Sequence, residues 1–138
     1  MAMRYFNVDE ATALLPRLTQ LTGTLRQLRD EALAKRAGID RLWRRLDAGE
    51  PVLSQIGDEQ RVLDELSKRL VATAGEIESI GCILRDLDRG LIDFPFRARG
   101  GAVFLCWKVG EPAILYWHGP NEGFAGRKPI AKLPVDQA

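Results

Sequence analysis

Apolar side chains in the first half of the chain recur three and four residues apart, which is the spacing of one face of an α-helix. One series spans Leu18–Leu46 and a second spans Val52–Ile80. Polar residues interrupt the series at Lys35, Glu59 and Thr73. The pattern predicts two long helices with heptad seams, as in a coiled coil. The positions expected in the core include Leu25, Leu28, Leu66 and Leu70.

The segment Asp47–Pro51 separates the two series and carries the signals that end a helix. Gly49 can adopt the left-handed conformation of a C-cap, and Pro51 cannot continue the helix. Because this connection is short, the two helices are predicted to be antiparallel neighbours.

The start of the helical region also has a recognisable pattern. Asn7, followed three residues later by Glu10, fits a capping box in which each side chain accepts a hydrogen bond from the other residue's backbone N–H. Pro16 lacks the N–H of an intrahelical bond, and a proline inside a helix costs ~3 kcal/mol or more. A short first helix with a kink or break near Leu15 is therefore expected.

Four glycines, Gly23, Gly38, Gly57 and Gly75, lie off the apolar seams. Two interpretations stay open. They are tolerated surface glycines, or they allow another helix or subunit to approach the backbone closely.

After Gly81 the period changes to short apolar runs separated by glycine and proline. Four of these runs are typical of strands: Cys82–Leu87, Leu91–Phe96, Ala102–Lys108 and Ala113–His118. They predict a four-stranded antiparallel meander. The expected fold class is α+β in a single domain, 1–138, with a long antiparallel helical hairpin over 1–80, a small antiparallel β-meander over 81–130 and a tail over 131–138.

Pairing of Lys108 with Ala113 would set the register of the last two predicted strands. In that register Cys106 and His118 point to opposite faces of the sheet, because side chains alternate along a strand. A catalytic Cys106–His118 dyad is then excluded unless a bulge shifts the register. Cys106 and Cys82 are interpreted as buried structural cysteines.

Both faces of this predicted sheet are largely apolar, and one helical hairpin can cover only one of them. The other face needs the C-terminal segment or a second subunit. This argument predicts a homo-oligomer, in the simplest case a dimer, with Trp107, Tyr116 and Trp117 as core or interface aromatics.

Charge and composition exclude several classes of function. Twenty basic and nineteen acidic residues give a net charge of +1, which is too balanced for a nucleic-acid binder. Two cysteines and one histidine cannot form the Cys/His set of a structural zinc site, so no metal site and no cofactor are expected.

The start of the chain lacks the apolar run of a signal peptide, and no stretch is long enough for a membrane span. The protein is expected to be cytoplasmic, with reduced thiols and no membrane contact.

Several segments together resemble a known family. The runs FNVDEATALLP, GCILRDLDRGLIDFPF, VFLCWKVGEPAILYWH and GFAGRKPI are similar to those of the bacterial family called Domain of Unknown Function 2203. The resemblance covers the first 17 residues and most of the chain from Gly81 to Ile130. It implies a small cytoplasmic bacterial protein and brings no established activity.

The Gly-rich stretch Gly119–Pro129 is the best candidate for a ligand site. Its glycines could direct backbone N–H groups at an anion, and Arg127 could bind that anion through two N–H groups, with His118 and Asp93 nearby. Structural roles are the alternative for each residue. Arg127 could form a clamp with Asp93 or Glu122, Asp93 could accept in an Asx turn before a proline, and His118 could bond to backbone.

Glu111 lies in the predicted turn and is expected to pair with a nearby Arg or Lys. The leading functional hypothesis is a non-enzymatic, self-associating interaction or scaffold module, which could also bind an unknown protein partner. The alternative is a binder of a small anion such as a phosphorylated metabolite, or an enzyme acting on one. Whether the protein is an enzyme stays open, and no catalytic residue is assigned.

Overall fold

The computed structural model describes residues 3–135 and divides into two compact units. One unit is formed by the chain up to Thr22 together with the chain from Glu76 onward, and the other is Gly23–Gly75. Helices α1 (Val8–Asp47) and α2 (Leu53–Ile80) each contribute residues to both units. Within the described residues, no helix is long and apolar enough to cross a membrane.

The N-terminus of α1 confirms the predicted capping box. The Glu10 N–H donates to Asn7 Oδ1 over 2.7 Å, and the Asn7 N–H donates to Glu10 Oε1 over 3.0 Å. The predicted break near Leu15 is wrong, because α1 continues through Pro16 to its end. Leu15 and Leu18, on either side of the proline, are buried, so core packing outweighs the lost backbone hydrogen bond.

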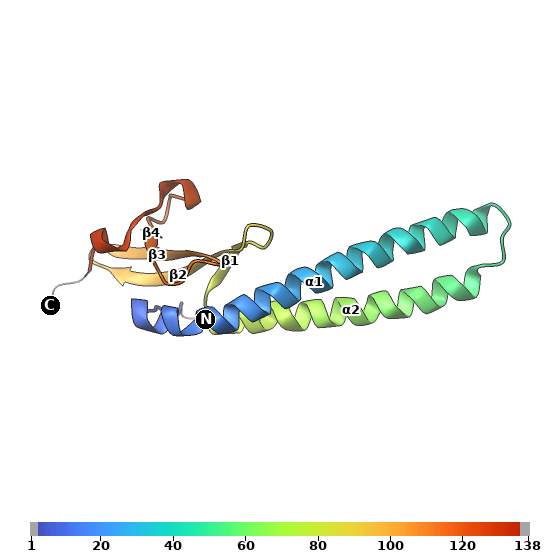
Figure 1. Cartoon of the computed structure of the whole chain (residues 1–138), viewed down its shortest axis with the longest axis horizontal. Helices are drawn as coiled ribbons and strands as arrows, with labels where there is room; N and C mark the ends of the chain where they lie inside the picture. The colour runs from blue at the N-terminus through green and yellow to red at the C-terminus, as the bar shows by residue number, and fades with distance from the viewer. Residues whose placement is uncertain (1–2, 136–138) are drawn as a thin grey trace. The chain divides into compact units, whose positions relative to one another are not determined.

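The unit Gly23–Gly75 is the predicted antiparallel hairpin of α1 and α2 (Figure 1). Gly49 has φ +95° and its N–H donates to the Leu46 carbonyl, as expected for a helix C-cap. Lys35 and Glu59, which interrupt the two apolar series, form an ion pair with each other. Three of the four expected core leucines, Leu25, Leu28 and Leu66, are buried, whereas Leu70 is half-buried.

The other unit contains a five-stranded antiparallel sheet in the order β1-β2-β3-β4-β5. The strands are β1 (Ile83–Asp86), β2 (Leu91–Ala98), β3 (Gly101–Lys108), β4 (Tyr116–His118) and β5 (Lys128–Pro129), and the short 3-10 helices Phe124–Gly126 and Ile130–Lys132 flank β5. The α+β class and the meander are confirmed. The sheet has one strand more than predicted, since part of the C-terminal segment pairs with β4.

The predicted register of the last two strands is wrong by one residue. Cys106 pairs with Tyr116, and Phe104 pairs with His118. The Lys108 N–H donates to the Glu111 carboxylate over 2.7 Å. In a tight hairpin this N–H would instead form the first backbone hydrogen bond between the two strands. The chain re-enters the sheet only at β4, and the faces of that strand are exchanged relative to the prediction.

One face of the sheet forms the core of this unit. Ile92, Phe94, Leu105 and Trp107 alternate along β2 and β3 and are almost completely buried. The ring of Phe6, just before α1, meets Phe94 edge-on with centroids 5.2 Å apart. This apolar layer fixes β2 and β3 and therefore also fixes the residues that alternate to the other face.

Candidate functional site

The second face of the sheet brings together three side chains that can bind protons or metals. Asp93 on β2 lies directly opposite Cys106 on β3. His118 on β4 lies opposite Phe104, two residues along β3 from Cys106, so it shares the same face. The register predicted from the sequence put His118 on the opposite face from Cys106, and the observed register overturns that prediction.

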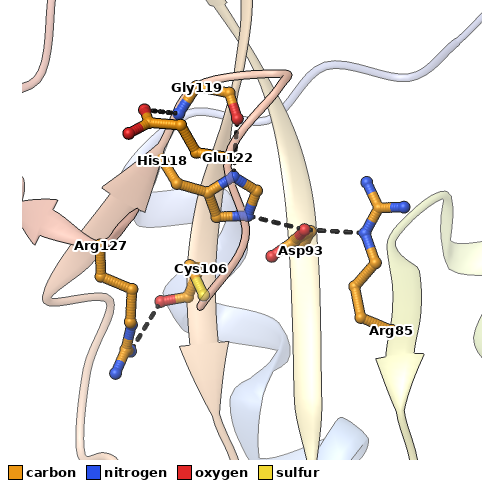
Figure 2. A network of polar contacts seen from close by, with 7 residues as sticks. All are labelled: Arg85, Asp93, Cys106, His118, Gly119, Glu122 and Arg127. Carbon is orange, nitrogen blue, oxygen red and sulfur yellow. Dashed lines mark hydrogen bonds and ion pairs between the residues drawn. The ribbon is translucent and has the colours of Figure 1, made fainter. Parts of the chain in front are cut away.

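These three residues form a compact buried cluster, here called the Asp–Cys–His cluster. One carboxylate oxygen of Asp93, Sγ of Cys106 and a ring nitrogen of His118 all lie within 4.8 Å of one another. The residues are only 2%, 2% and 3% exposed, respectively. No other group of three such donors occurs among residues 3–135. Figure 2 shows Asp93 between His118 and Arg85, with the Cys106 side chain alongside.

The hydrogen bonds of His118 determine where its protons lie. Nδ1 is 2.8 Å from the Gly119 carbonyl oxygen, which can only accept, so Nδ1 carries a hydrogen. Nε2 is 2.9 Å from Oδ2 of Asp93. If the ring were neutral with its hydrogen on Nδ1 and the carboxylate were ionised, Nε2 and Oδ2 would both be acceptors. Two acceptors cannot form a hydrogen bond with each other. One further proton is therefore held between His118 and Asp93.

The same geometry decides against Cys106 as an activated nucleophile. Burial and the neighbouring Asp93 carboxylate raise the pKa of the Cys106 thiol to about 11. Both ring nitrogens of His118 are engaged elsewhere, so the imidazole is not directed at the thiol as a base. Residues Cys106 and His118 are close in space but do not form a catalytic dyad.

Arg85, which was not among the residues predicted from the sequence, extends the cluster toward solvent. Its Nε–H donates to Oδ2 of Asp93 over 2.9 Å. The register of β1 shifts between Leu84 and Asp86, which places Arg85 at a bulge, a feature that often redirects a side chain. The guanidinium also lies over the Phe104 ring, 5.1 Å from its centroid.

A cavity of about 260 Å³ adjoins the Asp–Cys–His cluster. Its lining combines the cluster with a half-exposed arginine, an acidic side chain and several apolar groups. The lining residues outside the cluster are Arg85, Leu91, Pro120, Glu122, Gly123 and Phe124.

Arg127 occupies a different environment from Asp93 and His118 and does not line this cavity. One Nη donates to Glu111 Oε1 over 2.5 Å and to the Cys106 carbonyl oxygen over 3.2 Å. Its guanidinium lies 4.0 Å from the Tyr116 ring centroid. The expected pairing of Arg127 with Asp93 or Glu122 is wrong, because Arg127 pairs with Glu111. The expected pairing of Glu111 with a basic residue is confirmed.

Two glycines of the loop after β4, Gly119 and Gly126, pack against Glu122. A Cβ on Gly119 or on Gly126 would come within 2.9 Å of the Glu122 side chain. The Gly119 N–H donates to Glu122 Oε1 over 2.9 Å, and Lys128 forms an ion pair with the same carboxylate. These two donors lower the pKa of Glu122. Gly119 and Gly126 therefore allow close approach to an acidic side chain of the chain itself.

Two further expectations concern Asp93 and the aromatic residues. Asp93 lies within β2 and accepts side-chain hydrogen bonds, so the predicted Asx turn is wrong, whereas the predicted backbone bond of His118 is confirmed. Trp107 is buried and donates to the Glu111 carbonyl oxygen. Tyr116 and Trp117 are half-buried beneath the cationic groups of Arg127 and Lys128, respectively.

The donor types of the Asp–Cys–His cluster fit a transition metal of the zinc class. Imidazole, thiolate and carboxylate are all zinc ligands, whereas Ca²⁺ and Mg²⁺ prefer oxygen alone. A metal-binding histidine commonly donates its other N–H to a carbonyl or carboxylate, as Nδ1 of His118 does toward Gly119. The expectation of no metal site considered only cysteine and histidine. The structure brings the carboxylate of Asp93 into the set.

Comparison with known proteins identifies a family without a described activity. A family model with the description "Uncharacterized conserved protein (DUF2203)" matches residues 4–130. This match confirms the resemblance drawn from the sequence motifs. No curated protein and no solved structure gives a significant match.

Proposed function

We propose that this chain, which belongs to the uncharacterised conserved family DUF2203, binds one zinc-class divalent metal ion through Asp93, Cys106 and His118. The observation that carries the proposal is the convergence of a carboxylate, a thiol and an imidazole within 4.8 Å on three adjacent strands. Three protein ligands leave one tetrahedral position for another group, which is the arrangement of catalytic rather than structural zinc.

The surroundings of the cluster support metal binding. Arg85 holds the Asp93 carboxylate, and the Gly119 carbonyl holds the His118 ring, so both ligands have partners that would orient them toward an ion. The strands β2 and β3, which carry Asp93 and Cys106, are fixed by the apolar layer on the opposite face. Ligands on rigid elements need little reorganisation when an ion binds.

The test is titration of metal-free protein with Zn²⁺, followed by calorimetry, and with Co²⁺, followed by absorption. One ion should bind per chain, and Co²⁺ should give a thiolate-to-metal charge-transfer band in the near ultraviolet. Cys106→Ser should abolish that band. It should also weaken Zn²⁺ binding by more than the ~10–100-fold typical of residues that only support a ligand.

Cys82 provides the matched control for that variant. It is also buried, its pKa is also raised to about 11, and its Sγ–H donates to the Ile77 carbonyl rather than joining the cluster. Cys82→Ser should leave the charge-transfer band and the Zn²⁺ affinity unchanged. Absence of stoichiometric metal binding, or equal loss in the two serine variants, would contradict the proposal.

Metal binding should release protons, and this gives a pH dependence of known sign. The pKa of the Cys106 thiol, raised to about 11, keeps it protonated near neutrality, and the bound form must be thiolate. Zn²⁺ affinity should therefore rise by at least ~10-fold per pH unit between pH 6 and 8, as measured by competition with a chelator.

Self-association is a second candidate function, favoured by the surface of the unit Gly23–Gly75. That unit carries large apolar side chains that are 45% to 73% exposed. They are Leu33, Trp43, Leu53, Val62 and Val71. Light scattering coupled to size exclusion should give the mass of a dimer or larger species. Replacement of Leu33, Leu53 and Val71 by Gln should reduce it to the mass of one chain. A single-chain mass of the unmodified protein at all micromolar concentrations would exclude this function.

A further inference from the structure

We propose, building on the proposed metal site, that its open position takes the carboxylate of a small organic monoanion and that Arg85 binds the second carboxylate oxygen. The ligand would occupy the cavity of about 260 Å³ beside the Asp–Cys–His cluster. Three features favour this ligand class: the position of one arginine, the charge of the loaded site and the lining of the cavity.

Arg85 is placed to bind a second partner while it holds the first. Its Nε–H is used by Asp93, and the two outer nitrogens of the guanidinium have no hydrogen-bond partner within the described part of the chain. The side chain is 46% exposed, lines the cavity and lies over the Phe104 ring. A planar guanidinium positioned in this way matches the geometry of a carboxylate.

The charge of the loaded site favours a single negative charge on the ligand. A divalent ion would be neutralised by the Asp93 carboxylate and the Cys106 thiolate, with His118 as a neutral ligand. Arg85 then contributes one uncompensated positive charge. The other acidic group of the cavity, Glu122, is already paired with Lys128. A dianion such as hydrogen phosphate would leave a net negative charge in the cavity, so a monoanion fits better.

The size and lining of the cavity favour a short apolar body on that monoanion. Its volume lies below the ~300–1,000 Å³ of pockets that hold drug-sized ligands. Leu91, Pro120 and Phe124 supply apolar surface beside the polar cluster. A branched aliphatic carboxylate of four or five carbons could place its head on the metal and Arg85 and its alkyl group against these residues.

The experiment uses the full chain loaded with Co²⁺, whose visible absorption bands change when a ligand enters the coordination shell. Isobutyrate should change these bands in a saturable manner. Isobutyramide, which has the same shape without the charge, and inorganic phosphate should bind at least ~10-fold more weakly. Arg85→Gln should weaken isobutyrate roughly 10–100-fold, the value of a charge-assisted hydrogen bond.

Arg89 supplies the matched control for the arginine variant. Its guanidinium lies over Phe124, 5.0 Å from the ring centroid, but Arg89 does not line the cavity. Arg89→Gln should leave isobutyrate affinity unchanged. The Co²⁺ affinity of each variant is measured first, and the anion titration is performed at saturating Co²⁺, so a change in metal binding is not mistaken for a change in anion binding.

The possible outcomes separate the two proposals. Co²⁺ binding without a spectral response to isobutyrate, an equal response in Arg85→Gln, or tighter binding of phosphate would overturn the carboxylate ligand and leave the metal site intact. A protein that binds no Co²⁺ overturns both. A saturable response that requires Arg85 and the negative charge supports the ligand class.

Discussion

The hairpin unit Gly23–Gly75 and the sheet of the other unit differ in how far they bury their paired polar side chains. In the hairpin, Lys35 and Glu59 replace apolar residues of the seams, and their paired side chains remain 31% and 38% exposed. In the sheet, the side chains of Asp93 and His118 are 3% and 4% exposed. An exposed ion pair contributes ~0–1 kcal/mol, whereas separating a buried pair costs several kcal/mol because the remaining group is left without water.

This difference shows where function can be expected. The hairpin buries the apolar residues of its seams along its length and leaves its charged residues in contact with solvent. The sheet holds three polar side chains out of water on one face while the other face supplies the core. A fold rarely keeps such a cluster where an apolar residue would serve, so the cluster is the region in which chemistry is most worth testing.

The largest expected effect is the loss of Asp93. Asp93→Ala removes the carboxylate that pairs with His118 and Arg85, and it leaves a buried imidazole without its partner. We expect a loss of roughly 3–5 kcal/mol in the free energy of unfolding, measured by denaturant titration.

The hairpin provides the contrasting aspartate. Asp64 is exposed and accepts a hydrogen bond from Gln60 on the same helix face. Asp64→Ala should change the free energy of unfolding by less than ~0.5 kcal/mol. Similar losses at Asp93 and Asp64 would show that the buried cluster contributes no more than a surface contact.

A second comparison tests the hairpin core itself. Leu28 is buried, with 3% of its surface exposed, whereas Leu70 is only half-buried. Leu28→Ala should cost ~2–5 kcal/mol, because it removes buried methyl groups and leaves a cavity. Leu70→Ala should cost clearly less. Equal losses in denaturant titrations would mean that the two seams pack in a different register from the one described.

Sequence periodicity predicted the hairpin because the same spacing of apolar residues recurs at every turn of a helix. Leu25, Leu28 and Leu66 were identified as core, and Gly49 as a C-cap, without knowledge of any distant contact. Leu70 is less buried than predicted. Pro16 was misjudged, since a local penalty was weighed without the tertiary packing on either side of it.

The candidate site could be predicted only in part, because it depends on strand register. A shift of one residue moves every side chain of a strand to the other face. Here the Lys108 N–H donates to Glu111 at the start of the connection between β3 and β4, and the alternation of apolar residues does not show this contact. Asp93 and His118 were therefore identified as candidates for one site, but Cys106 was assigned to the opposite face from His118. Arg85 was missed because its position depends on a bulge.

Alanine substitutions at two glycines have the smallest expected effects on the free energy of unfolding. The two effects differ in sign between the hairpin and the sheet unit. Gly75 lies within α2, and a Cβ there would meet no atom within 4 Å. Gly75→Ala should stabilise the protein by roughly 0.5–1 kcal/mol, because alanine has the higher helix propensity. Gly90, in the turn before β2, has φ +68°, and its Cβ would lie 3.0 Å from the Val109 side chain. Gly90→Ala should therefore destabilise by at least ~1 kcal/mol in the same thermal or denaturant measurement. Destabilisation by Gly75→Ala would instead indicate that another helix or subunit approaches the backbone at that position, the alternative that the sequence left open.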